Sequence, residues 1–280
     1  MATNVFPVTS IDDERLAPYR DLRHHNTTRA ATWFIAEGNK LVDRLLTSRF
    51  PTHSIFADES YVDELLPRVP DSVPVYVAPR KLLEATIGFH FHRGCLACGL
   101  RLPALQLHDW SPPGERSTIV VCPDVQDPTN LGVVLRNCAA FGVDLVLLGG
   151  KCADPFSRRV LRVSMGAVLD LAIITPRDLA ADLASLQSKY GVQTIATVLD
   201  PAADILESSA RPLRMALLLG SEGHGLEAAW TDAADQRVTI PMELGTDSLN
   251  VAVASGIFLY HYTRRAALYL GIRQTPCSSR

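Results

Sequence analysis

The sequence lacks the features that would place the protein in a membrane or on a secretory route. No apolar run approaches the roughly eighteen residues needed to span a bilayer, because the longest, from Val251 to Tyr260, ends at His261. The first twenty residues contain Asp12, Asp13 and Glu14 instead of an apolar core. We therefore expect no signal peptide and a cytoplasmic location.

The chain also lacks an excess of positive charge. It carries 27 lysines and arginines against 30 aspartates and glutamates, a formal net charge of −3. The protein as a whole does not attract polyanions, so a nucleic-acid partner would have to be met by a local basic patch. Two stretches could supply one: residues 15–29, which include two histidines, and residues 158–162 with three arginines.

Cysteines are few and scattered. The six cysteines suit a reducing compartment. Cys95 and Cys98 have the CxxC spacing of zinc and redox sites, but the sequence has no second pair, although His90 and His92 are close. We expect two small buried residues of a strand here, and no metal site.

A polar segment over residues 107–116, LHDWSPPGER, predicts a linker between two domains, one over 1–106 and one over 117–280. In the first domain, Trp33 to Ala36 and the runs HSIFAD, PVYVAP and GCLACGL predict short strands. A turn at Glu37-Gly38 leads into a helix with one apolar face, formed by Leu41, Val42, Leu45 and Leu46. This pattern indicates a small α/β domain.

In the second domain, strand-like runs alternate with helical patterns. The runs are STIVVCP, DLVLLG, LAIIT, VQTIATVL, RMALLLG and RVTIPM, and the helical patterns cover 130–141, 157–168, 178–190, 226–234 and about 249–270. Continuous apolar strands indicate a parallel sheet with helices on both faces. Ligands of such sheets bind beyond the carboxyl ends of the strands. The loops after Cys122, Leu219 and Ile240 are therefore the candidate site.

These three loops carry unusual polar and glycine residues. In the first, Asp127 or Thr129 can cap a helix whose apolar positions are Leu131, Val134, Leu135, Cys138 and Phe141. Asn130 and Arg136 are the polar residues of that unit. The second loop holds Gly220, Glu222, Gly223 and Gly225, and the third holds Ser248 and Asn250.

Each of these residues also has an ordinary structural explanation. The glycines can serve a plain strand-to-helix turn, and their spacing and late position argue against the GxGxxG dinucleotide fingerprint. Glu222, Ser248 and Asn250 can act as caps, Asn130 as a turn residue and Arg136 as a surface residue. The presence of all five polar residues at the carboxyl end of one predicted sheet favours a functional site.

Together these segments resemble the SpoU (TrmH-type) branch of the SPOUT RNA methyltransferases. Residues 127–136 match the motif D-P-x-N-x-G-x-x-x-R, residues 220–226 match G-x-E-x-x-G-L, and Ile240 to Met242 with Ser248 to Val251 match I-P-M and S-L-N-V. A fainter motif, R-x-S-x-G-A, occurs over 162–167. The likeness covers about 117–270. FIAEGNKLV and HRGCLACG resemble, more loosely, a ribosomal-L30-like RNA-binding domain, in which Cys95 and Cys98 replace residues that are more usually aliphatic.

The resemblance implies transfer of a methyl group from S-adenosylmethionine (SAM) to a ribose 2′-hydroxyl of RNA, without a metal. It implies a parallel-sheet domain closed by a deep trefoil knot, which sequence physics would not suggest because knots are nearly absent from proteins. It further implies a homodimer. The cofactor would be held by the second and third motifs, at Leu219, Gly220, Gly223, Ile240, Met242 and Leu249.

By the same resemblance Arg136 acts on the ribose hydroxyl. Because an arginine stays protonated in proteins, we expect it to bind the substrate's phosphate and ribose oxygen and to stabilise the developing alkoxide. Water or phosphate would then accept the proton. The residues expected to position Arg136, the ribose and the cofactor are Asn130, Glu222, Ser248 and Asn250.

RNA affinity is expected from the first domain, where four basic side chains could contact phosphates, which position RNA without reading its sequence: Arg23, His24, Arg29 and Lys40. The two-domain organisation favours rRNA over tRNA as substrate. Two further hypotheses remain: an RNA-binding protein that kept the fold without catalysis, and a nucleotide-linked dehydrogenase. The intact motif residues argue against the first, and the glycine spacing argues against the second.

Overall fold

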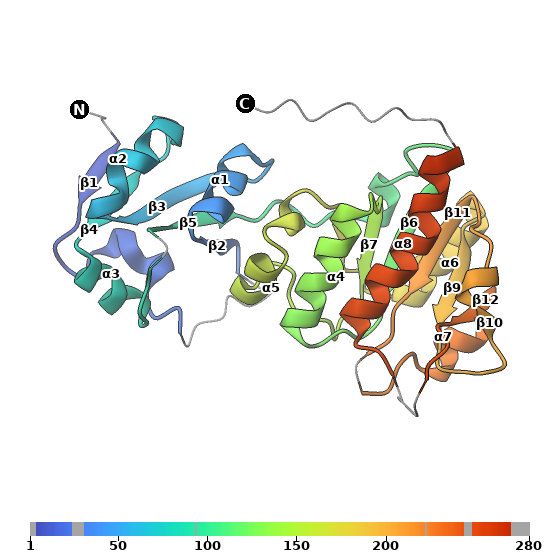
Figure 1. The fold of residues 1–280 in the computed structure, drawn as a ribbon. Helices are drawn as coiled ribbons and strands as arrows, with labels where there is room; N and C mark the ends of the chain where they lie inside the picture. The colour runs from blue at the N-terminus through green and yellow to red at the C-terminus, as the bar shows by residue number, and fades with distance from the viewer. Residues whose placement is uncertain (1–3, 24–30, 93, 222, 244–247, 270–280) are drawn as a thin grey trace. The chain divides into compact units, whose positions relative to one another are not determined.

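The computed structural model describes residues 4–23, 31–92, 94–221, 223–243 and 248–269 of the chain (Figure 1). They form two compact units. The first comprises Met1–Ala104, Asp127–Arg136 and Ala153–Asp170, and the second comprises Leu105–Gln126, Asn137–Cys152 and Leu171–Arg280. Within the described part of the chain, no helix is both long and apolar enough to cross a membrane.

The first unit contains a mixed five-stranded sheet in the order β1-β4-β3-β5-β2. Strands β1, β4 and β3 are parallel, whereas β5 pairs antiparallel with both β3 and β2. The strands are β1 (Val5–Pro7), β2 (Trp33–Glu37), β3 (Thr52–Asp58), β4 (Val75–Ala78) and β5 (Cys95–Leu100). The helices between them are α1 (Asn39–Thr47), α2 (Val62–Leu65) and α3 (Arg80–Ile87), with 3₁₀ turns η1 (Glu14–Tyr19), η2 (Glu59–Tyr61) and η3 (Leu66–Arg68).

The strands expected in this region and the helix after Glu37-Gly38 are confirmed. Gly38 has the left-handed φ of 92° that the turn requires, and Leu41, Val42 and Leu45 of α1 are buried. Strand β1, helices α2 and α3, and the 3₁₀ turns η1, η2 and η3 were not predicted from the sequence. Helix α3 could have been found from its flanking residues, since Pro79 precedes it and Gly88 ends it in the left-handed conformation.

The second unit contains a seven-stranded sheet in the order β10-β12-β9-β11-β6-β7-β8, in which every pair is parallel. The strands are β6 (Ser117–Cys122), β7 (Leu145–Leu148), β8 (Ile173–Ile174), β9 (Gln193–Thr197), β10 (Asp204–Ile205), β11 (Arg214–Leu218) and β12 (Gln236–Thr239). The expected parallel sheet is therefore confirmed, with β10 as an additional two-residue edge strand.

Helices cover both faces of this sheet (Figure 1). On one face, Leu183 and Leu186 of α6 (Leu179–Tyr190) and Trp230 of α7 (Ala228–Asp232) pack over Ile119 and Val121. Helix α8 (Val251–Tyr269) covers the other, where Asn137 near the end of α4 (Pro128–Ala140) contacts it. The start of the expected linker is packed as well, because Leu107 and Trp110 lie against the core of this sheet beside η4 (Leu107–Asp109).

One predicted helix is wrong. The pattern over 157–168 indicates a continuous helix, but α5 ends at Val163 and a 3₁₀ turn, η5 (Ala167–Leu169), follows. Met165 and Gly166 are both left-handed, with φ of 54° and 80°. The amide of Gly166 donates to the carbonyl of Leu161 at 2.9 Å and that of Met165 to Arg162 at 3.1 Å. This is the Schellman pattern of a helix end, which apolar periodicity does not reveal.

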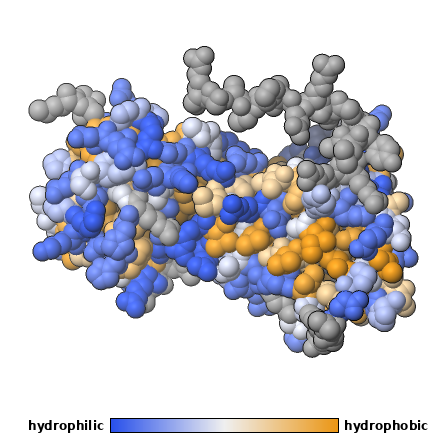
Figure 2. Space-filling view, in the orientation of Figure 1, coloured by the Kyte–Doolittle hydropathy of each residue, from blue (hydrophilic) through white to orange (hydrophobic). Residues whose placement is uncertain are grey.

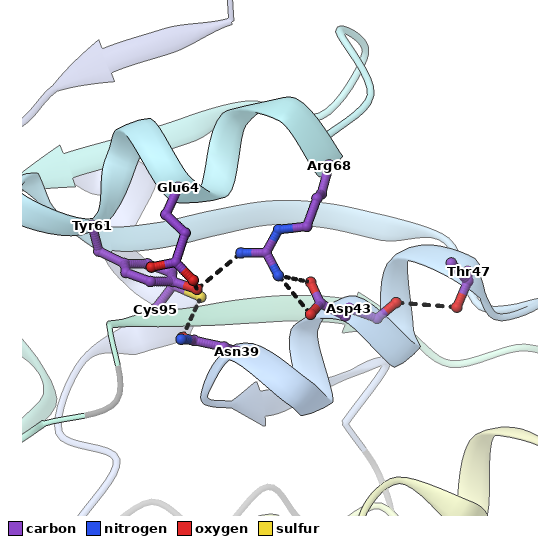
Figure 3. A network of polar contacts seen from close by, with 7 residues as sticks. All are labelled: Asn39, Asp43, Thr47, Tyr61, Glu64, Arg68 and Cys95. Atoms are coloured by element: carbon purple, nitrogen blue, oxygen red, sulfur yellow. Dashed lines mark hydrogen bonds and ion pairs between the residues drawn. The ribbon is translucent and has the colours of Figure 1, made fainter. Parts of the chain in front are cut away.

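The CxxC cysteines lie in β5 and are buried, as expected for two strand residues. Figure 3 shows Cys95 within a polar network of the first unit. Its thiol donates to Asn39 Oδ1 at 3.6 Å, and nearby Arg68 donates to Asp43 at 2.6 Å and to the Tyr61 hydroxyl at 2.9 Å. Among the described residues, no three His, Cys, Asp or Glu side chains group in a way that could hold a metal ion.

Burial raises the pKa of both the Cys95 and the Cys98 thiols to about 12. At about pH 8 each would be thiolate in roughly one molecule in ten thousand, and the thiolate is the reactive form. We predict that iodoacetamide leaves both residues unmodified in the native protein and modifies them after denaturation, as measured by peptide mass spectrometry. Fast modification of the native protein would contradict the buried placement of β5.

The turn after β7 packs directly on the loop after β6. The amide of Gly149 donates to the Cys122 carbonyl at 2.9 Å. A Cβ atom at Gly149 would lie 2.0 Å from the Pro123 oxygen, whereas one at the neighbouring Gly150 would meet nothing within 4 Å. The two adjacent glycines therefore differ sharply in the space available to a side chain.

We predict that Gly149→Ala lowers the free energy of unfolding by about 2 kcal/mol or more, because two backbone segments must separate. The matched variant Gly150→Ala should stay within about 0.5 kcal/mol of the wild type. Chemical denaturation of both variants measures the difference. Equal midpoints would show that the loops do not pack as described.

Candidate functional site

The first motif begins at the end of β6. Helix α4 starts at Pro128, a residue suited to the first helical position. Asp127 Oδ1 accepts hydrogen bonds from the amides of Thr129 and Asn130, each at 2.8 Å. Of the two caps that the sequence allows, Asp127 is therefore the one used. The Asp-Pro pair of the motif is explained by helix initiation alone.

Arg136 has no such structural explanation. The apolar residues of α4 predicted to face the core, Leu131, Val134, Leu135 and Cys138, are fully buried, whereas Arg136 is exposed. Among the described residues it makes neither a hydrogen bond nor an ion pair with another side chain. Asn130 is half-buried in the first turn of the same helix. A cation held on a rigid helix without a protein partner is suited to an anionic ligand.

Cys152 fixes the loop that leads from β6 towards α4. Its thiol donates to the Cys122 carbonyl at 3.0 Å, and its sulfur accepts from the amide of Val125 at 3.2 Å. Cys152 and Val125 are both buried. Cys152 and Gly149 therefore fix the conformation of the loop from Cys122 to Val125. This role of Cys152 was not predicted from the sequence.

The second motif forms a tight turn after β11. Leu219 is buried, and its amide donates to the Val121 carbonyl at 2.9 Å. Gly220 lies against the backbone of Gly225, since a Cβ atom there would be 2.3 Å from the Gly225 carbonyl carbon. Gly225 has a φ of 66°, and its amide and carbonyl both pair with the backbone of Ser221. The turn itself therefore requires Gly220 and Gly225.

Gly223 differs from these two glycines. It is exposed, and a Cβ atom there would meet nothing within 4 Å. The described fold does not require a glycine at this position, so the space beside it is available to a ligand. Glu222, the acidic residue of the motif, lies outside the described residues.

The third motif follows β12 and leads into α8. Ile240, Met242 and Leu249 are half-buried, and Ser248 and Asn250 are exposed. Asn250 Oδ1 accepts from the amide of Ala252 at 2.9 Å, and its carbonyl accepts from Ala254 at 2.9 Å. The capping role that the sequence allows as the structural alternative for Asn250 is therefore observed, whereas Ser248 precedes the helix.

The sheet brings the starting points of these segments to one edge. Strands β6 and β11 are hydrogen-bonded neighbours in the register Val121 to Leu218. Strand β12 lies one strand further, beyond β9. Because all are parallel, the loops after Cys122, Leu218 and Thr239 leave from the same carboxyl edge, as the sequence predicts.

The proposed RNA contacts belong to the first unit. Arg23 and Lys40 are exposed, whereas His24 and Arg29 lie outside the described residues.

Lys40, at the start of α1, lines a cavity of about 270 Å³ together with Glu37, Gly38, Asn39, Leu41, Arg162 and Met165. Glu37 is buried and pairs with Arg158 at 3.1 Å and with Arg162 at 3.7 Å. Arg162 belongs to the fainter motif, so this motif also has a structural role.

Comparison with known proteins agrees with this arrangement. Residues 117–260, which include all seven strands of the second sheet, match the model of the SpoU rRNA Methylase family. A Mycobacterium tuberculosis protein named as an uncharacterized tRNA/rRNA methyltransferase is 38% identical over 269 residues, covering 93% of this chain and 92% of that one. A 23S rRNA (guanosine-2′-O-)-methyltransferase of Vibrio cholerae is 31% identical over 213 residues, covering 72% and 84%.

Among solved structures, the AdoMet-bound rRNA methyltransferase from Sinorhizobium meliloti is similar, with a TM-score of 0.80 and 28% identity, covering 94% of this chain and 98% of that chain. The family model spans the motif-bearing sheet, and the mycobacterial relative spans nearly the whole chain. This chain therefore belongs to the SpoU rRNA methylase family.

Proposed function

We propose that the protein transfers the methyl group of SAM to a ribose 2′-hydroxyl of RNA, and that this RNA is rRNA. The observation that carries the proposal is the departure of the three motif segments from one edge of a parallel sheet in a chain of this family. The rRNA assignment is supported by the Vibrio cholerae relative, whose name specifies 23S rRNA and the 2′-oxygen. Family membership and the motif residues argue against both the dehydrogenase and a non-catalytic protein.

The residues that would hold SAM suit its parts. Ile240, Met242 and Leu249 are half-buried and leave apolar surface open for an adenine ring. The open space beside Gly223 allows backbone groups to approach the ligand closely. Leu219 and Gly220 fix the start of this segment on the sheet. When bound, the cofactor supplies an electrophilic methyl group on a sulfonium.

The chain's own residues must orient and activate the nucleophile, because a ribose hydroxyl is a very weak acid. Arg136 would hold the phosphate and the ribose oxygen and stabilise negative charge as it develops. It stays protonated, so water or the phosphate would accept the proton. Asn130, Glu222 and Ser248 would orient the ribose and the cofactor. Asn250, whose side chain caps α8, would hold the segment before that helix in place.

The first unit would supply RNA affinity through Arg23, His24, Arg29 and Lys40, in an L30-like domain over residues 1–106. The exposure of Arg23 and Lys40 supports this proposal, and phosphate contacts of this kind position RNA without selecting a sequence. We also propose that the second and third motifs form the trefoil knot of the family. The similarity to the Sinorhizobium meliloti structure over 94% of this chain supports a shared chain path.

A homodimer is the proposed assembly, formed through α8. Val253, Ile257 and Tyr260 are 53%, 39% and 51% exposed and are spaced along one side of the helix, while Phe258, Leu259 and Tyr262 on other sides are buried. Figure 2 shows apolar surface over this helix. A helix that is apolar on more than one side needs a second cover.

We predict a mass in light scattering of twice the 30.6 kDa of one chain at micromolar concentration. Ile257→Glu should shift the protein towards the monomer, because a dimer would have to bury a carboxylate in an apolar contact. Leu213→Glu is the control, since Leu213 is also in the second unit and is 62% exposed, but lies beside Tyr190 and Gln193 just before β11. A monomeric wild type would exclude this assembly.

We predict that Arg136→Ala keeps SAM affinity within a few-fold and loses at least about a hundredfold in methyl transfer, since an electrostatic contact to the transition state is removed. Arg136→Lys should not restore transfer, because lysine cannot present the planar fork to two oxygens. Single-turnover transfer of labelled methyl to rRNA and calorimetric SAM binding measure the two effects, and mapping of the labelled nucleotide tests the 2′-hydroxyl.

Lys189→Ala is the control for loss of a cation. Lys189 lies over the Tyr190 ring at the amino edge of the sheet, at 4.9 Å from the ring centroid, so transfer should be unchanged. Loss of SAM binding in Arg136→Ala, or near-normal transfer in Arg136→Lys, would disprove the role assigned to Arg136. Absence of transfer to any rRNA by the wild type would disprove the proposed function.

A further inference from the structure

Asn137, the residue after Arg136, ties α4 to the first turn of α8. Its side-chain amide donates to the Ala252 carbonyl at 3.0 Å and to the Ser255 hydroxyl at 2.9 Å. Ala252 and Ser255 are buried, and Ser255 also donates to the Ala252 carbonyl at 2.8 Å. The Asn137 side chain thus donates to a backbone carbonyl of a helix that lies more than a hundred positions away in the sequence.

The two helices meet in a defined register. A Cβ atom at Gly256 would lie 3.3 Å from Asn137 Nδ2, so the glycine leaves room for the amide. Just after the end of α4, the Phe141 ring packs edge to face against the ring of Tyr260 in α8, with centroids 6.4 Å apart. Helices α4 and α8 therefore run side by side in the same direction (Figure 1).

Hydrogen bonds from a side-chain amide fix the register of two helices more strictly than apolar packing does. Apolar side chains tolerate a shift along the helix axis, whereas a buried amide loses its partners after such a shift. The two acceptors of Asn137 lie in the turn that Asn250 caps, since the Ala252 amide donates to Asn250 Oδ1 at 2.9 Å. Ala252 of α8 is thus held through its amide by Asn250 and through its carbonyl by Asn137.

We infer that Asn137 is a positioning residue for methyl transfer. It holds the capped start of α8, and with it the third motif, in register with the helix that carries Arg136. The inference rests on the proposed function, because it gives Arg136 a role in the reaction. Asn137 itself would touch neither substrate nor cofactor.

The structure allows a clean test of this inference. In Asn137→Ala, Ser255 still donates to the Ala252 carbonyl, so no buried carbonyl loses its last partner. The change should therefore preserve folding while it loosens the register. Misplacement of a reacting group by about 1 Å can cost up to about a hundredfold in rate. We expect kcat to fall at least about tenfold, with KM for SAM and for RNA within about threefold of the wild type.

Asn137→Asp separates hydrogen bonding from packing. The aspartate has the same shape, but its carboxylate would face the Ala252 carbonyl and cannot donate to it. We expect a loss of kcat at least as large as in Asn137→Ala, whereas a residue that merely fills space would tolerate the change. Ser255→Ala removes one of the two acceptors and should have a smaller effect on kcat.

Gln187→Ala is the matched control. Gln187 is also half-buried in the second unit, and its amide donates to Thr194 Oγ1 at 3.4 Å and to Asp235 at 3.2 Å. Its removal should lower the melting temperature to a similar extent without changing kcat. Unchanged kcat in Asn137→Ala, or an equal loss in Gln187→Ala, would overturn the inference while the wild type is active. An inactive wild type would instead overturn the proposed function, and the inference with it.

Discussion

The parallel pairing of β6 with β11 is the interaction on which the rest of the second unit depends. These two strands occupy the middle of the sheet and are paired over five residues, from Ser117 with Arg214 to Val121 with Leu218. Their side chains, except that of Arg214, are fully or almost fully buried. Since the strands point the same way, the loop towards the first motif and the glycine turn of the second motif emerge as neighbours. The bond from the Leu219 amide to the Val121 carbonyl extends this pairing into the turn.

Several motif residues have a structural role in the described fold, whereas others have none there. Asp127 caps α4, Gly220 and Gly225 permit the turn, and Asn250 caps α8. Arg136 and Gly223 fulfil no comparable structural need within the described chain. The geometry therefore separates the motif residues that shape the loops from those that the described fold does not require, and the latter are the ones proposed to act in the reaction.

Most of the second sheet could be predicted from the sequence because its strands are buried on both faces, which makes them continuous apolar runs. The two-residue β10 is exposed and carries no such signal. The end of α5 was missed because Met165, a residue that usually continues a helix, adopts a left-handed conformation there. The three-residue β1 was missed because an edge strand with two exposed residues resembles a loop.

The site was predictable to the extent that it lies in local motifs. Arg136 and Asn130 could be identified as candidates because they follow one strand at short range, and the capping role of Asn250 follows from its place before a helix. The hydrogen bonds of Cys152 to the loop after β6 and of Asn137 to α8 could not be predicted. Each joins segments that are separated in the sequence and come together only in the complete fold. A lone buried cysteine or an asparagine within a helix gives no local sign of such a partner.

The central pairing also has a consequence for synthesis of the protein. Strand β6 leaves the ribosome long before β11, and its other neighbour, β7, covers only one of its two edges. At the usual speed of translation the gap lasts on the order of ten seconds. During that time an apolar strand has an open edge that could pair with another nascent chain. A strand that is fully buried in the mature protein is thus one that needs protection while the chain is being made.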